Sequence, residues 1–267
     1  MKKGLWVGLV TLVCALVAAT ALAAGGTWKQ LGKTGDWDGT IAATMKDGSI
    51  WTIEKSGALY ITNPSDGTWK QIGKSEFANT KFLFGDPSAL FSIETDGSLY
   101  KINAADGTWK QVGKKGDWKD TKVGVTQGGT LYTIENSGKL FATDLGKGTW
   151  KQIGKPDFAN TKFMMEAGSS LYTIENDGTL YVITPSSGTW KQVGKKTDYK
   201  ATIAGVGMGG MLYTVESSGN LYVTDPAKGT WKQLGKAEFG KTKYILPLGT
   251  DLSTIENDGS LYRIATN

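Results

Sequence analysis

The residues best suited to binding chemistry are acidic side chains that directly precede an aromatic one. They occur in three equivalent loops, as Gly35-Asp36-Trp37, Gly116-Asp117-Trp118 and Thr197-Asp198-Tyr199. An aromatic ring can cover the apolar face of a sugar while carboxylate, amide and backbone groups bond its hydroxyls. The structural alternative is that the ring fills a gap between repeats and the Asp caps a turn.

A second set of loops alternates with the first. These loops read Glu76-Phe77-Ala78-Asn79, Asp157-Phe158-Ala159-Asn160 and Glu238-Phe239-Gly240-Lys241. The alternation indicates duplication of an ancestral pair of units followed by triplication. It predicts pseudo-threefold rather than pseudo-sixfold symmetry.

The loops belong to a repeat of about 40 residues, marked by the phrase Gly-Thr-Trp-Lys-Gln. The phrase begins at Gly26, Gly67, Gly107, Gly148, Gly188 and Gly229. Within one unit, segments 149–153, 161–165, 170–175 and 179–184 are rich in β-forming residues, and Glu175-Asn176-Asp177-Gly178 has the composition of a hairpin turn. Four short strands in each repeat of this length are typical of a propeller blade. An open β-solenoid is the alternative.

The two ends of the repeat array complement each other. The first unit starts with an outer strand at 27–31, and the last ends at 261–264 without one. Pairing these segments would close a ring and hide both edges. We therefore predict an all-β, six-bladed propeller of four-stranded antiparallel blades, closed by the N-terminal outer strand, with pseudo-threefold alternation of blade types. The domain would cover 24–267, with repeats 26–66, 67–106, 107–147, 148–187, 188–228 and 229–267.

Residues 1–23 have the features of a signal peptide. Met1-Lys2-Lys3 is a short positive start, an apolar stretch follows, and Ala21-Leu22-Ala23 fits a cleavage site. We predict a secreted, periplasmic or cell-surface protein without a membrane span after cleavage. An uncleaved anchor is the alternative, since the apolar stretch is about long enough to cross a bilayer.

The composition argues against most catalytic chemistry. The chain has no histidine, and its single cysteine, Cys14, lies in the predicted signal. Zinc, haem, Cys-His and Ser-His-Asp sites therefore lose their usual ligands and bases. The net charge of +5 is spread along the repeats, unlike the clustered basic face of a nucleic-acid binder. We predict that the protein is not an enzyme and that it binds no cofactor, metal or nucleic acid.

Residues that recur in every unit are predicted to serve the fold. Glutamates before the hairpin turn are expected to be structural, and lysines after the outer strand to be solvated. Packing between blades is the favoured role of the recurrent tryptophans, with sugar stacking as the alternative. These tryptophans are Trp28, Trp69, Trp109, Trp150, Trp190 and Trp231.

The units resemble tachylectin-2 and the wider tectonin-type β-propeller lectins, and also secreted bacterial propellers of the same repeat type. The resemblance lies in segments such as 77–84, 97–101 and 69–73, and it covers all six units. It implies a lectin that binds sugar at equivalent sites between neighbouring blades. By matching loop position, the candidate ligand-binding residues are Asp36, Trp37, Asp117, Trp118, Asp198 and Tyr199, with Asn79 and Asn160 in the alternate loops.

Our first hypothesis is a secreted multivalent carbohydrate-binding propeller whose partners are glycans or cell-envelope polysaccharide. The second is a non-catalytic protein-interaction or structural module of the cell envelope, for which the propeller is a rigid platform with a protein partner. A propeller quinoprotein is the third, supported only by analogy of fold.

Overall fold

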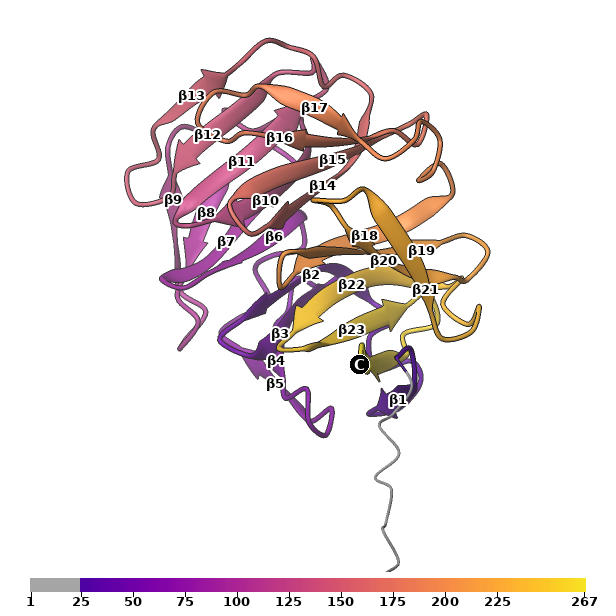
Figure 1. The fold of residues 1–267 in the computed structure, drawn as a ribbon. Helices are drawn as coiled ribbons and strands as arrows, with labels where there is room; N and C mark the ends of the chain where they lie inside the picture. The colour runs from indigo at the N-terminus through magenta and orange to yellow at the C-terminus, as the bar shows by residue number, and fades with distance from the viewer. Residues whose placement is uncertain (1–24) are drawn as a thin grey trace, which may run out of the picture.

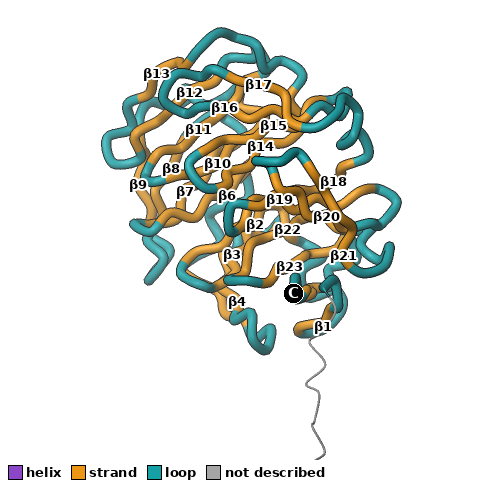
Figure 2. The backbone as a smooth tube through the Cα atoms, in the orientation of Figure 1, coloured by secondary structure: helices purple, strands orange, loops and turns teal. Residues whose placement is uncertain are grey.

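The computed structural model describes residues 25–267, which form 24 strands in six four-stranded sheets arranged around a centre (Figure 1). No helix occurs among these residues, and loops join the strands throughout (Figure 2). The predicted signal segment lies outside the described residues. Within the described part of the chain, no helix is long and apolar enough to cross a membrane.

Each of the first five sheets runs from an inner to an outer strand in chain order. The first blade contains β2 (Thr40–Lys46), β3 (Ser49–Glu54), β4 (Leu59–Thr62) and β5 (Trp69–Ile72). The second contains β6 (Thr80–Asp86), β7 (Ala89–Glu94), β8 (Leu99–Ile102) and β9 (Trp109–Val112). The third contains β10 (Thr121–Gln127), β11 (Thr130–Glu135), β12 (Leu140–Asp144) and β13 (Trp150–Ile153).

The remaining blades repeat this plan. The fourth contains β14 (Thr161–Ala167), β15 (Ser170–Glu175), β16 (Leu180–Ile183) and β17 (Trp190–Val193). The fifth contains β18 (Thr202–Met208), β19 (Met211–Glu216), β20 (Leu221–Asp225) and β21 (Thr230–Leu234). The sixth contains β22 (Thr242–Leu248), β23 (Asp251–Glu256) and β24 (Leu261–Ile264), completed by β1 (Trp28–Leu31).

The ring closes through the first strand of the described chain. β1 pairs antiparallel with β24, with Trp28 opposite Ile264 and Leu31 opposite Leu261. Gly26 N–H also donates to Ala265 O at 2.7 Å. The prediction of a six-bladed propeller closed by its N-terminal outer strand is confirmed.

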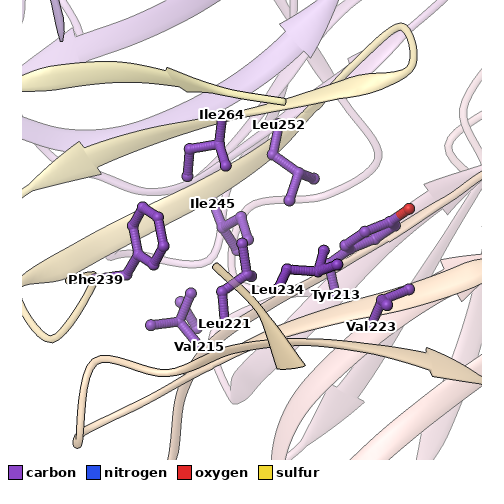
Figure 3. Packing of buried hydrophobic residues seen from close by; sticks show 10 residues of the cluster. Tyr213, Val215, Leu221, Val223, Leu234, Phe239, Ile245, Leu252 and Ile264 are labelled. Carbon is purple, nitrogen blue, oxygen red and sulfur yellow. The ribbon is translucent and has the colours of Figure 1, made fainter. Parts of the chain in front are cut away.

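The hydrophobic cores lie between neighbouring blades. Figure 3 shows the core between the fifth and sixth blades, where Val215 and Leu221 face Phe239 and Ile245. Blade sheets are therefore buried on both faces along their middle strands, which explains their nearly continuous apolar runs. The outer strands are buried only at their last residue, such as Leu31.

One aromatic residue from every crossing loop completes the core between two blades. Its backbone N–H donates to the carbonyl of the preceding blade's hairpin glycine at 2.9–3.1 Å, which fixes the loop to the neighbouring blade. At Gly97, with φ of 81°, an added Cβ would lie 2.5 Å from the Lys119 backbone, so the close approach requires glycine. The six aromatics, all buried, are Trp37, Phe77, Trp118, Phe158, Tyr199 and Phe239.

Three lysines link the inner strands with threefold symmetry. The Lys81 ammonium of the second blade donates to Thr121 O of the third. Equivalent bonds join the fourth blade to the fifth and the sixth to the first, through Lys162 to Thr202 O and Lys243 to Thr40 O. This alternation agrees with the predicted pseudo-threefold relation.

Candidate functional site

Two equivalent surface pockets lie beside the crossing loops that enter the second and fourth blades, with volumes of about 250 and 360 Å³. We call them the even-blade pockets. The second-blade pocket is lined by Glu76, Phe77, Asn79, Glu94, Thr95, Asp96, Tyr100 and Trp109. The fourth-blade pocket is lined by Asp157, Phe158, Asn160, Glu175, Asn176, Asp177, Tyr181 and Trp190. The two sets match position by position along the repeat.

The aromatic wall of each pocket comes from the outer hairpin of the blade. Tyr100 on β8 lies opposite Gln111, so it is a diagonal neighbour of Trp109 on the same face of the sheet. Their ring centroids are 4.5 Å apart, and the corresponding Tyr181–Trp190 pair is at 4.7 Å. Trp109 remains 43% exposed, which leaves part of the indole open to a ligand.

An acidic side chain of the crossing loop holds the indole in place. Trp109 Nε1 donates to Glu76 Oε2 at 3.1 Å, and Trp190 Nε1 donates to Asp157 Oδ2 at 2.9 Å. The indole N–H is thereby satisfied within the protein. The carboxyl group of the crossing loop fixes the edge of the indole, while the face of the ring stays available to a ligand.

A second acidic residue lies at the end of the middle strand. Glu94 Oε1 accepts hydrogen bonds from Thr80 Oγ1 at 2.8 Å and Ser92 Oγ at 2.7 Å. Burial raises the pKa of Glu94 above its usual value, while the two hydroxyl bonds oppose the rise. Glu175 has the same pattern, in which burial raises the pKa and Thr161 opposes it.

A third acidic residue comes from the hairpin turn. Asp96 accepts the backbone N–H of Ser98 at 2.9 Å, and this bond lowers the pKa of Asp96. Lys115 of the next crossing loop forms an ion pair with Asp96, with Nζ 3.1 Å from Oδ2. Lys196 pairs with Asp177 in the same way, at 3.3 Å between Nζ and Oδ2. Each even-blade pocket thus combines three aromatic rings with three carboxyl groups, together with one amide in the second blade and two in the fourth.

The predicted site residues divide into two groups. Asn79 and Asn160 line the even-blade pockets, and Asp198 and Tyr199 border a smaller pocket of about 100 Å³ at the fifth blade. The rings of Trp37, Trp118 and Tyr199, however, are only 2%, 3% and 4% exposed. Trp118 Nε1 donates to Thr143 Oγ1, and Tyr199 OH lies 3.1 Å from Thr224 Oγ1. These three rings therefore do not offer an open face to a sugar, as the packing alternative predicts.

The aspartates that precede these rings bind their own loops. Asp36, Asp117 and Asp198 accept the backbone N–H groups of Lys33, Lys114 and Lys195 at 2.9, 3.3 and 3.1 Å. Asp117 also accepts from Trp150 Nε1 at 3.2 Å. In the structure these aspartates cap the turns of their own loops, which is the alternative to sugar binding given by the sequence.

The sequence favours packing for the recurrent tryptophans, and sugar stacking is only its alternative. The structure leaves Trp109 and Trp190 43% and 44% exposed in the pocket walls. The neighbouring rings of Tyr100 and Tyr181 are not among the predicted site residues. The signal that distinguishes the tryptophans is the Trp-Lys-Gln sequence itself: three exposed residues in a row on an outer strand, where only the fourth is buried.

The centre of the propeller contains a separate cavity of about 480 Å³ lined by the inner strands. Apolar side chains such as Met45, Phe84 and Met165 dominate its wall, with Lys81 and Glu166 as charged members. Burial raises the pKa of Glu166. Across residues 25–267, no group of three His, Cys, Asp or Glu side chains is placed to hold a metal ion.

Comparison with known proteins identifies the family. The DUF6242 beta propeller domain matches residues 115–248, half of the chain. The chain belongs to the DUF6242 beta-propeller domain family. This description names a fold and no reaction. No curated protein matches the sequence, and the resemblance to tectonin-type lectins stays a prediction.

Solved structures are similar to this DUF6242 propeller in fold. Virginiamycin B lyase from Staphylococcus aureus has a TM-score of 0.63 at 11% identity, over 90% of this chain and 99% of that one. BamB from Moraxella catarrhalis has a TM-score of 0.51 at 14% identity, over 84% and 68%. A structure of YCF48 bound to D1 peptide has a TM-score of 0.62 at 12% identity, over 90% and 97%. At these identities the likeness shows the propeller fold alone.

Proposed function

We propose that this DUF6242 propeller is a multivalent, non-catalytic glycan-binding protein whose ligands enter the even-blade pockets. The observation that carries the proposal is the partly exposed Trp109, fixed beside Tyr100 and surrounded by Glu76, Asn79 and Glu94, with the same arrangement in the fourth blade. An aromatic surface suits the apolar face of a pyranose, and carboxylate and amide oxygens suit its hydroxyls.

The dimensions and number of the pockets support this function. The two volumes, about 250 and 360 Å³, lie just below and just above the lower limit of about 300 Å³ for small-molecule sites, which favours one or two sugar units. Sites of this size bind weakly one at a time. Two sites on a rigid ring gain avidity on a glycan-coated surface when both can engage at once. The leader predicted over residues 1–23 would deliver the protein to envelope glycans.

A glycan array followed by titration of a positive oligosaccharide tests the proposal. Trp109→Ala and Trp190→Ala remove the aromatic wall of one pocket each, and the double variant is expected to weaken binding by about tenfold or more. Lys74→Ala, an exposed substitution in the crossing loop of the second blade, serves as the control. An array without any binding at high protein concentration would refute the proposal.

A protein or peptide ligand is the second candidate, because the structurally similar YCF48 has been solved with a bound D1 peptide. Capture of a defined envelope protein that free oligosaccharides do not displace, and that Trp109→Ala does not weaken, would favour this function over glycan binding.

A further inference from the structure

We propose that the even-blade pockets take the ammonium group of an amino sugar, and that the equivalent place in the sixth blade is filled by the chain's own Lys241. The inference rests on the proposed glycan binding and narrows it to a class of saccharide. It also sets the number of sites of this type at two rather than three.

The first argument is the charge of the pockets. Each has a carboxyl group from the crossing loop, one from the middle strand and one from the hairpin turn; the sets are Glu76, Glu94 and Asp96, and Asp157, Glu175 and Asp177. Exposed Lys115 and Lys196 reach only the turn aspartates. Within residues 25–267, no lysine or arginine lies at ion-pair distance from the other two carboxyl groups of either pocket. In the fourth-blade pocket the positive charge of Lys122 opposes the rise in the pKa of Glu175. A neutral ligand would bring no cation to the remaining carboxyl groups.

The second argument is the placement of the aromatic rings. A cation is attracted to the face of Trp or Tyr by about 0.5–2 kcal/mol. Trp109 and Tyr100 stand beside the acidic groups, and Glu76 fixes the indole through Nε1. Glu94 uses Oε1 for Thr80 and Ser92, while Oε2 has no donor among the described residues. The pocket therefore offers a ligand cation both a ring surface and a carboxylate oxygen.

The third argument comes from the sixth blade, where a lysine stands at the position that an asparagine has in the other two even blades. Trp28 Nε1 donates to Glu238 Oε2 at 2.8 Å, and the Trp28 and Tyr262 ring centroids are 4.9 Å apart, as in the even-blade pockets. The position of Asn79 and Asn160 is occupied by Lys241. Asn257 N–H donates to Lys241 O at 2.8 Å, just as Asn176 N–H donates to Asn160 O and Thr95 N–H to Asn79 O at 2.8 Å. The backbones of Asn79, Asn160 and Lys241 therefore have equivalent positions in their blades.

The Lys241 charge acts on the carboxyl groups that a ligand cation would meet. Burial raises the pKa of Glu256, and the positive charge of Lys241 is among the effects that oppose the rise. The pKa of Asp258 is lowered first by the Ser260 N–H, and Lys241 lowers it further. Glu256 and Asp258 correspond to Glu94 and Asp96 in the second blade. An amine therefore stands in the sixth blade where the second and fourth blades have an amide.

Titration calorimetry of the full chain with three β-1,4-linked disaccharides tests the ligand class: the diamino form, its di-N-acetylated form and the neutral parent. We expect the diamino form to bind about tenfold more tightly than the other two, with two sites per chain. Equal or tighter binding of an uncharged disaccharide would overturn the inference while leaving glycan binding intact. Failure of all three together with a blank glycan array would overturn the proposed function as well. A blank result for the diamino form with a positive array for other glycans would overturn the inference alone.

Exchange of asparagine and lysine at the position shared by Asn79, Asn160 and Lys241 tests the number of sites. Lys241→Asn is expected to raise the stoichiometry from two to three, and Asn79→Lys to lower it from two to one. Lys236→Asn removes the same charge from the same crossing loop and is expected to leave two sites. An unchanged stoichiometry in both Lys241→Asn and Asn79→Lys would refute the assignment of Lys241. If a lysine-containing peptide binds the even-blade pockets more tightly than the diamino sugar, the ligand is a peptide and the inference is wrong.

Discussion

Glu94 shows how one buried carboxyl group couples the stability of the fold to pH. Burial raises its pKa above the usual 4.5, and the Thr80 and Ser92 hydroxyls only partly compensate. Because the folded state takes up a proton before the unfolded state does, stability rises as the pH falls through the folded pKa towards 4.5. In the folded protein, burial therefore disfavours the charged carboxylate of Glu94, which is present at neutral pH, relative to the protonated form.

The substitution Glu94→Gln tests this coupling, since it keeps an acceptor for the two hydroxyls and removes the charge. The free energy of unfolding of the wild type relative to the variant is expected to increase between neutral pH and about 4.5. Urea denaturation at several pH values measures the difference. Asp66→Asn provides a contrast of opposite sign: the Thr68 bonds lower the Asp66 pKa, so its contribution is lost only below the usual 3.8. A pH-independent difference for Glu94→Gln would contradict the prediction.

At the residue scale the sequence predicts which positions matter better than it predicts their roles. Recurrence in all six units marks both the buried loop aromatics and the half-exposed tryptophans, because both sit at fixed places in a blade. Trp118 lies in a crossing loop that inserts deeply between two blades, whereas Trp109 lies on an exposed outer strand. This difference in burial depends on tertiary packing. The resemblance, applied by loop position, predicts Asn79 and Asn160 as ligand-binding residues. Sugar stacking by Trp109 is only an alternative at the level of sequence, and Tyr100 is not among the candidates.

The inner strands of even blades are tied to their neighbours by lysines, and Lys81 illustrates the energetics. Its ammonium group donates to Thr121 O and lies 5.2 Å from the Phe82 ring centroid. Lys81→Met would keep the apolar stem and remove the donor. We expect a loss of about 1.5–3 kcal/mol in the free energy of unfolding, as for a hydrogen bond to a charged group.

Denaturant unfolding of Lys81→Met beside Lys74→Met measures this loss. Lys74 is exposed in a crossing loop, so its substitution is expected to be nearly neutral. Equal stabilities of the two variants would show that the inter-blade bond contributes nothing.

At the element scale the strands and their order could be predicted almost completely. The periodic Trp-Lys-Gln and turn glycines fix four strands in each unit, and observed bounds such as Thr161–Ala167 and Ser170–Glu175 agree closely with the predicted segments. The alternation of loop sequences predicts two blade types. The lysine links that express it, however, join residues of different blades, which a single repeat cannot reveal.

The closed ring depends on a four-residue strand. β1 supplies the outer edge of the sixth blade, and Leu31 is buried in the core against the first blade. Removal of residues 25–31 would expose the edge of β24 and open a hydrophobic core. We expect the melting temperature to fall by about 5 °C or more, together with aggregation.

Thermal unfolding and light scattering of this deletion should be compared with those of a variant lacking only residues 1–24. A synthetic peptide covering 25–31, added to the deletion variant, should restore part of the lost stability by occupying the β24 edge. Unchanged melting of the deletion variant would mean that β1 does not close the ring.

Pairing of β1 with β24 also dictates an order of events during protein synthesis. Of the described strands β1 is synthesised first and its partner β24 last, so β1 stays unpaired while the first five blades assemble. Every other strand pair joins near neighbours along the chain and can form as it emerges. Closing the circle is thus a single long-range step that comes after translation of the final hairpin, and it is the step at which a slow or crowded chain is most exposed to pairing with another copy.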